Sequence, residues 1–101
     1  MSFATYFEWE IREGGEAAFT AAWEVATRVL LTHGSHGSAL FRTDAGNFAA
    51  LARWPDRATR DAGFAEATFP GEATAMGREI VRTTHRIDLE GVSDLWTWQS
   101  P

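Results

Sequence analysis

Alternation of apolar and polar side chains predicts a β-strand at the start of the chain. Within residues 3–11 the odd positions carry Phe, Thr, Phe, Trp and Ile, whereas the positions between them carry Ala, Tyr and two Glu. A period of two over this length is typical of a strand that buries one face. The glycine pair Gly14 and Gly15 ends the pattern.

The next segment has helical spacing. Between Phe19 and Leu30 the large apolar side chains recur three or four residues apart, which predicts an amphipathic helix. Glu16 stands at the expected start of this helix, where the helix dipole favours an anion. His33 and Gly34 suit its C-terminal end.

A hairpin and a sharp corner follow the helix. The apolar runs Leu40–Arg42 and Phe48–Trp54 flank Asp44–Gly46, and a glycine-containing turn between two such runs predicts a β-hairpin. Pro55 cannot extend a central strand, and Asp56 is a good N-cap for a helix. The hairpin is therefore expected to lead directly into a second helix.

The last part of the chain predicts two helices and a strand. The second helix runs from residue 56 towards residue 67, and Phe69-Pro70 interrupts it because the residue before proline avoids helical geometry. A third helix is expected over roughly residues 72–81, and the alternation at residues 85–89 predicts a final strand. The element order favours an α+β fold, with a ferredoxin-like four-stranded antiparallel sheet and helices on one face. Residues 1–101 are expected to form a single domain.

The second strand of the hairpin is apolar on both faces. Phe48, Ala50, Ala52 and Trp54 point one way, and the residues between them include Ala49 and Leu51. A solvated sheet face would be more polar, so the second face is expected to pack against another surface. Tyr6 and either Leu40 or Phe41 are expected to join Leu51 there. A second copy of the chain is the simplest partner, which predicts a homodimer.

Composition and charge narrow the function classes. The chain has 101 residues, a net charge of −5 and no cysteine. These values argue against nucleic acid, anionic membranes, disulfides and Cys-ligated metals as parts of the function. No run is apolar enough to span a membrane and no signal peptide is seen, so a cytoplasmic protein is expected. All nine cations are arginine, a bias that fits a bacterial genome rich in G and C.

Three sequence segments resemble one family. The run GSHGSALFR, the run FAALARWPD after the hairpin turn and a late DLW look like the antibiotic biosynthesis monooxygenase family. The resemblance extends from Phe3 to Trp96 and implies a dimeric α+β barrel, in which two sheets pack face to face. Relatives of this kind include cofactor-free oxygenases of anthrones and quinols, and haem-degrading enzymes. Trp54 matches the family's tryptophan at the end of the third strand. Those oxygenases also use asparagine, tyrosine or arginine in the pocket, and Asn47 and Tyr6 are the only asparagine and tyrosine of this chain.

Aromatic side chains mark the candidate site. A pocket is expected between sheet and helices because strand and helix spacing directs several large side chains there. His85 is the best candidate for a proton acceptor near neutral pH, although a hydrogen-bonded structural role is the commoner one for such a histidine. His33 and His36 are interpreted as a helix end and a loop residue, and no metal site is expected. The predicted lining comprises Trp9, Phe19, Trp23, Phe64 and Met76 for ligand binding, with Phe69 closing the pocket and Trp54 and His85 as catalytic candidates.

Two function classes remain open. The first is a cofactor-independent monooxygenase that acts on an aromatic quinol or anthrone-like molecule. The second is a non-enzymatic dimeric binding or accessory domain with the same pocket, since fold alone does not decide function. In either case Leu95, Trp96 and Trp98 are costly to leave in water, so the C-terminal segment is expected to pack across the dimer interface.

Overall fold

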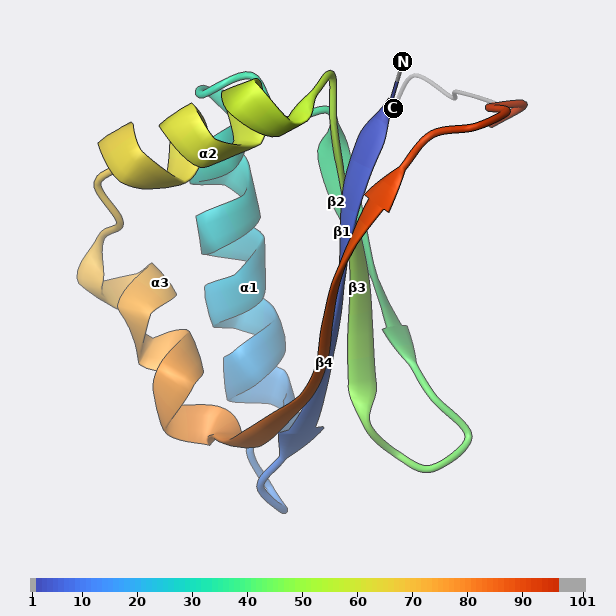
Figure 1. Ribbon diagram of the computed structural model, residues 1–101. Coiled ribbons are helices and arrows are strands. Elements are labelled where there is room, and N and C mark those ends of the chain that lie inside the picture. The colour runs from blue at the N-terminus through green and yellow to red at the C-terminus, as the bar shows by residue number, and fades with distance from the viewer. Residues whose placement is uncertain (1, 97–101) are drawn as a thin grey trace.

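The computed structural model describes residues 2–96 and contains one antiparallel sheet covered on one face by helices (Figure 1). The strand order is β2-β3-β1-β4. The predicted ferredoxin-like α+β fold is confirmed by this order and by the helices on one side. In chain order the elements are β1 (Phe3–Ile11), α1 (Glu16–Leu31), β2 (Gly37–Arg42), β3 (Phe48–Trp54), α2 (Arg57–Glu66), α3 (Gly71–Thr74), the 3-10 helix η1 (Ala75–Glu79) and β4 (Ile80–Glu90).

The pairing of β1 with β3 builds the helix-facing side of the sheet. The register places Phe3 opposite Trp54 and Trp9 opposite Phe48. Because side chains alternate along strands, these four aromatic residues share one face, and each is at most 6% exposed. Phe19 from α1 is fully buried against this face. The alternation in the sequence therefore identified the core side of both central strands.

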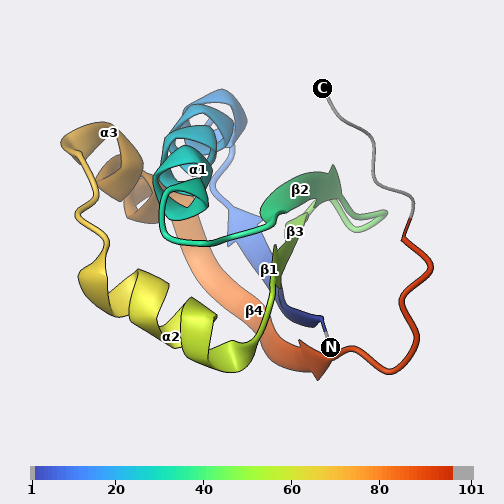
Figure 2. The same ribbon diagram turned by 90° about the horizontal axis from the view of Figure 1, so that it is seen from above.

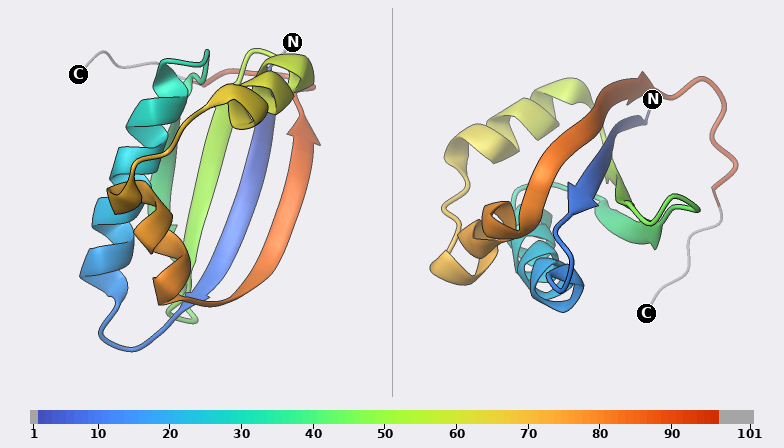
Figure 3. Two further views of the ribbon diagram at one scale, coloured as in Figure 1. Left: turned by 90° about the vertical axis from the view of Figure 1, so that its left-hand side faces the viewer. Right: turned by 90° about the horizontal axis from the view of Figure 1, so that it is seen from below.

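The first helix begins where the sequence predicted. Gly14 has a φ of +83°, a conformation that suits glycine, and its N–H donates to Oε1 of Glu16 over 3.1 Å. The last turn of α1 ends at Thr32, whose N–H donates to the carbonyl of Val29, and the N–H of His33 donates to the carbonyl of Leu30. Figure 3 shows α1 running along the sheet, with α2 crossing near one end of the strands.

The hairpin corner also forms as predicted. Asp56 is the N-cap of α2, because its Oδ1 accepts a hydrogen bond of 2.7 Å from the N–H of Thr59. The turn between β2 and β3 contains Gly46 with a φ of +88°. The aromatic-Pro-Asp sequence thus turns the chain from β3 directly into α2.

The predicted third helix is shorter than expected, and this part of the prediction is wrong. The α-helical part covers only Gly71–Thr74, a 3-10 helix follows, and β4 already begins at Ile80. Glu79 explains the early change, because its carboxylate accepts two hydrogen bonds from Arg12, of 2.6 and 2.9 Å. The carbonyl of Glu79 also accepts from the N–H of Arg12. These contacts fix the chain at the end of β1 and start strand pairing there.

Close contact between α2 and Trp54 fixes one end of the helical layer. A Cβ at Gly63 would lie 2.9 Å from Cη2 and 3.0 Å from Cζ3 of the Trp54 indole. Phe64 packs on the same ring, with the ring centroids 6.0 Å apart. Glycine has a low helix propensity, but at position 63 it is required because any side chain would prevent this close approach of α2 to Trp54.

A buried ion pair anchors α2 to the edge strand β4. Arg60 is 5% exposed and donates to Thr5 over 2.7 Å and to Asp88 over 2.8 Å. Its guanidinium also lies 4.9 Å from the centre of the Phe3 ring. Hydrogen bonding to Arg60 lowers the pKa of Asp88 from 3.8 to about 2. The pairing therefore stabilises the folded state as long as Asp88 is ionised.

Among the described residues the far face of the sheet carries no helix, and residues 91–96 run on that side (Figure 2). Asp94 forms an ion pair with Arg53, and the Trp96 ring lies 4.7 Å from the guanidinium of the same arginine. Within the chain the tail therefore packs on its own β3 strand. Trp98 lies outside the described residues. In residues 2–96 no helix is both long and apolar enough to cross a membrane.

We predict that Gly63→Ala destabilises the protein. The added methyl group gains helix propensity of about 1 kcal/mol, but it overlaps the indole of Trp54, and overpacking costs about 1–3 kcal/mol. A Cβ at Gly77 meets no atom within 4 Å, so Gly77→Ala is the matched control and is expected to be neutral or slightly stabilising. Urea unfolding measures both variants. A Gly63→Ala protein as stable as the Gly77→Ala protein contradicts the contact.

We predict that the stability lost in Asp88→Asn depends on pH. Since the folded pKa of Asp88 is about 2 and the ordinary value is 3.8, its contribution is complete above the ordinary value and disappears as the pH falls towards 2. The difference in Tm between wild type and Asp88→Asn should therefore be largest near neutral pH and shrink through this window. The exposed turn residue Asp44 supplies the control, Asp44→Asn. A Tm difference that stays constant down to pH 2 contradicts the assignment.

Candidate functional site

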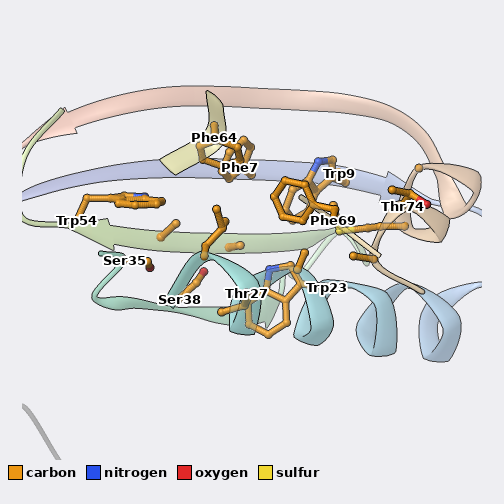
Figure 4. Close-up of a pocket in the computed structure, with 17 residues that line it drawn as sticks. Phe7, Trp9, Trp23, Thr27, Ser35, Ser38, Trp54, Phe64, Phe69 and Thr74 are labelled. Atoms are coloured by element: carbon orange, nitrogen blue, oxygen red, sulfur yellow. The ribbon is translucent and has the colours of Figure 1, made fainter. Parts of the chain in front are cut away.

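A cavity of about 350 Å³ lies between the sheet and the helical layer (Figure 4). Its walls come from β1, β2 and β3 on one side and from α1, α2, α3 and η1 on the other. Small side chains make the room, because Ala50 and Ala52 lie at the centre of the sheet where larger residues would fill the space. The volume falls in the range of small-molecule sites.

Most residues predicted for the pocket line it. Aromatic and sulfur-containing side chains surround the cavity from both layers, so its wall is mainly apolar. The predicted residues found there are Trp9, Trp23, Trp54, Phe64, Phe69 and Met76. The sequence prediction of an aromatic pocket between sheet and helices thus agrees with the geometry.

Phe19 needs a correction, because it does not line the cavity. It is fully buried behind the wall, with its ring centre 5.1 Å from that of Trp9 and 5.5 Å from that of Phe48. Helix spacing correctly placed Phe19 towards the sheet. However, it lies close to the β1 strand and fills the core, whereas Trp23, one turn later, reaches the cavity.

His85 also needs a correction, because it lies on the opposite face of the sheet from the cavity. The register pairs His85 with Glu8, whereas the cavity residue Trp9 belongs to the other parity of β1. The imidazole Nδ1 lies 3.6 Å from Oε1 of Glu8, and the ring lies edge-on to Tyr6. His85 therefore cannot act as the acid-base group of this cavity within one chain.

A polar cluster on that far face accounts for the other residues that the resemblance highlighted. Glu8 accepts hydrogen bonds of 2.9 Å from the Asn47 amide and of 2.9 Å from the Tyr6 hydroxyl. These bonds, that of Asn47 foremost, lower the pKa of Glu8, and the bond to Glu8 raises the pKa of Tyr6. Neither Asn47 nor Tyr6 lines the cavity, and the side chains of both donate to Glu8 on the far face instead.

Two buried polar atoms at the cavity have no hydrogen-bond partner in the described part of the chain. They are Nε1 of Trp54 and Oγ of Ser38, and both residues line the cavity. Two other wall hydroxyls have partners: Thr74 donates to the carbonyl of Gly71, and Ser35 accepts from the N–H of Gly37. Because buried polar groups are normally paired, the two atoms are the natural contacts for a bound molecule.

Sequence reasoning did not identify Ser38. The structure places Ser38 inside β2, opposite Ala52. The available signal was parity, because Ser38 alternates with Ala39 and shares a face with Leu40 in the same strand. That face continues the helix-facing side of β3.

The cavity wall carries no ionisable side chain. Every residue that lines it is apolar, aromatic, glycine, serine or threonine. Within residues 2–96 no group of three or more His, Asp and Glu side chains could hold a metal ion. The wall can therefore orient a ligand by shape and by two hydrogen bonds, but it offers no side chain that titrates near neutral pH.

Comparison with solved structures places this fold among known ones. SnoaB, a cofactor-independent oxygenase from Streptomyces nogalater, superposes with a TM-score of 0.77 and 15% identity, over 93% of this chain and 96% of its own. Rv0793 from Mycobacterium tuberculosis superposes with a TM-score of 0.74 and 13% identity, over 95% of this chain and 100% of its own. A protein of Caulobacter crescentus, described as a putative antibiotic biosynthesis monooxygenase, superposes with a TM-score of 0.75 and 15% identity, over 91% of each chain.

These similarities show that the chain shares the fold of these proteins. No protein-family model matches the sequence, and no curated protein does. Several of the structures that share the fold carry the name antibiotic biosynthesis monooxygenase, which supports the resemblance seen in the sequence at the level of architecture. At these identities the likeness shows the fold alone, and the activity has to be argued from the cavity.

We predict that substitutions at Trp54 and His85 separate the two faces of the sheet. Trp54→Phe removes an N–H and part of the cavity wall, so it should weaken binding of a flat aromatic ketone about tenfold. His85→Ala alters only the far face and should leave the affinity within about twofold, which is below one lost hydrogen bond. Equilibrium dialysis measures both. An affinity that depends on His85 and not on Trp54 contradicts the location of the site.

Proposed function

We propose that the protein is a cofactor-independent monooxygenase acting on an aromatic quinol or anthrone-like small molecule. The observation that carries this proposal is the aromatic cavity between the sheet and the helices, with the N–H of Trp54 in its wall unpartnered among the described residues. An indole N–H between apolar surfaces suits the oxygen of a flat aromatic ligand. The fold shared with SnoaB, described as a cofactor-independent oxygenase, supports the same reaction class.

In this proposal the chain acts by binding, orienting and stabilising an anion. The substrate loses a proton from its reacting carbon or phenol, and negative charge develops on its oxygen. The N–H of Trp54 donates to that oxygen inside a largely apolar cavity, where such a bond is stronger than in bulk water. The substrate anion then reduces O₂, so that an anthrone methylene and O₂ become a carbonyl and water. Since no wall residue titrates near neutral pH, the proton leaves to water.

The second candidate is a non-enzymatic binding or accessory domain with the same cavity. The absence of an ionisable side chain from the cavity wall favours it, because proton abstraction by a positioned base commonly contributes 10²–10⁴-fold to such reactions. In that case the cavity binds and shields an aromatic molecule without changing it. Turnover, not binding, distinguishes the two candidates.

We also propose that two copies of the chain pack through the far face of the sheet. Large apolar side chains remain exposed there and in the tail beside it, although helices cover the other face. The exposed fractions are 55% for Phe41, 45% for Ile87, 41% for Leu89, 91% for Leu95 and 53% for Trp96. A patch of this kind is characteristic of a protein interface, and a closed pair is the simplest arrangement.

We predict oxygen consumption without added cofactor when the protein meets a suitable anthrone or hydroquinone. An oxygen electrode tests a panel of both classes, with haem as a separate arm. Trp54→Phe should lower kcat/KM about 10²-fold, as expected for loss of one donor to a developing oxyanion. Binding without oxygen uptake across the panel contradicts the oxygenase and leaves the binding domain. Turnover of haem alone contradicts both proposed assignments.

We predict a dimer at micromolar concentration that dissociates when the far face is charged. Phe41→Glu and Leu89→Glu place a carboxylate within the proposed interface, where an unpaired charge is costly. Leu31→Glu is the matched control, since Leu31 is 48% exposed at the end of α1 on the helical side. Removal of residues 94–101 should weaken the dimer as well. Sedimentation of the wild type as a monomer contradicts the proposal.

A further inference from the structure

We propose that the cavity selects flat ligands without a permanent charge that carry a hydrogen-bonding oxygen on one edge, and that Ser38 recognises this edge together with Trp54. The inference rests on the proposed function, because it concerns the same cavity. It adds a specificity-determining residue and a substrate class, and it applies to a binding domain as well as to an oxygenase.

The first argument is that two buried polar atoms of the cavity wall lack a hydrogen-bond partner. Oγ of Ser38 and Nε1 of Trp54 are both removed from water, and Trp54 is only 1% exposed. Leaving buried donors unpaired costs free energy, so the site is incomplete without a partner. The indole can only donate, whereas the serine hydroxyl can donate and accept. A carbonyl oxygen has two lone pairs and can accept from both, and a phenolic oxygen can also donate to Ser38.

The second argument is the position of these atoms within the cavity. Trp54, Ser35 and Ser38 lie towards one end, whereas Phe69 and Thr74 lie towards the other (Figure 4). The hydroxyl of Thr74 already donates to the carbonyl of Gly71, over 3.0 Å. The two buried polar atoms without a partner therefore lie towards one end of the cavity. This asymmetry favours a molecule with its oxygen on one edge.

The third argument is charge. Among the described residues no cation lines the cavity, and two buried charged side chains of the fold, Arg60 and Glu79, already have partners. The guanidinium of Arg60 is held by Asp88 and Asp61. The carboxylate of Glu79 is held by Arg12. A carboxylate brought in by a ligand would lose its hydration without gaining a counter-ion, and the net charge of −5 also opposes it.

Equilibrium dialysis of three redox-stable probes against the full chain tests the inference. Fluorenone is flat and has one edge oxygen, fluorene lacks the oxygen, and fluorenone-2-carboxylate adds a charge. Fluorenone should bind about five- to tenfold more tightly than fluorene, the effect of one or two net hydrogen bonds. The carboxylate should bind at least roughly 100-fold more weakly than fluorenone. Equal affinity for fluorenone and its carboxylate overturns the charge selection.

Ser38→Ala tests the role of the residue. It should weaken fluorenone about threefold and leave fluorene unchanged, so that only the part of the preference due to the N–H of Trp54 remains. Thr20→Val is the matched control, since the Thr20 hydroxyl donates to the Glu16 carbonyl and does not line the cavity. An unchanged preference for fluorenone in folded Ser38→Ala overturns the role of Ser38. If this variant does not fold, Ser38→Cys, which keeps the size and weakens the donor, decides in the same way.

The outcomes separate this inference from the proposed reaction. The probes do not react with oxygen, so their binding order is independent of turnover. The predicted order without any oxygen uptake supports the inference and contradicts the oxygenase. Turnover of an anthrone together with equal binding of charged and uncharged probes overturns the inference and supports the oxygenase.

Discussion

The close approach of α2 to Trp54 is the constraint on which the site depends. Gly63 lies so near the indole that a single added carbon would overlap the ring, and Phe64 packs on the same ring. The indole is therefore held between the sheet and α2, at one end of the cavity. Because it cannot turn to find another partner, its N–H stays unpaired and remains available to a ligand.

The two faces of the sheet have separate chemistry as a result of strand pairing. The helix-facing side combines large aromatic side chains with alanines, which leaves an apolar cavity instead of a filled core. On the far face Tyr6 and Asn47 are hydrogen-bonded to Glu8, and His85 lies 3.6 Å from the same carboxylate, beside exposed apolar residues. Ligand binding is thus assigned to one side and self-association to the other, and substitutions can address them independently.

Local sequence patterns were sufficient for most of the fold. Alternation located β1, helical spacing located α1, and the turn with its Pro-Asp corner located the hairpin and the start of α2. The end of the third helix was missed because a long-range contact decides it. Arg12 and Glu79 are far apart in the sequence, and their bidentate pairing ends the helical segment before Ile80.

The site was predicted in part, and the errors have a common cause. The alternation along β1 and β3 was enough to predict that Trp9 and Trp54 face the same cavity. For His85 the parity within β4 was correct, but the face depended on its register with Glu8, which a single sequence does not fix. Parity could have placed Ser38 on the cavity face, but the missing partners of its hydroxyl and of the Trp54 N–H could not be predicted, because an unpaired atom is defined by all of its neighbours.

The most direct test of this account is the indole N–H resonance of Trp54 in a ¹H–¹⁵N NMR titration. Trp54→Phe assigns the resonance by its disappearance. The account predicts that fluorenone shifts this resonance downfield, because its N–H begins to donate to the ketone oxygen, and that fluorene does not. It also predicts that Ser38→Ala reduces the shift. A shift confined to other indoles, or an equal response to fluorene, would contradict the claim that the Trp54 N–H is the ligand contact.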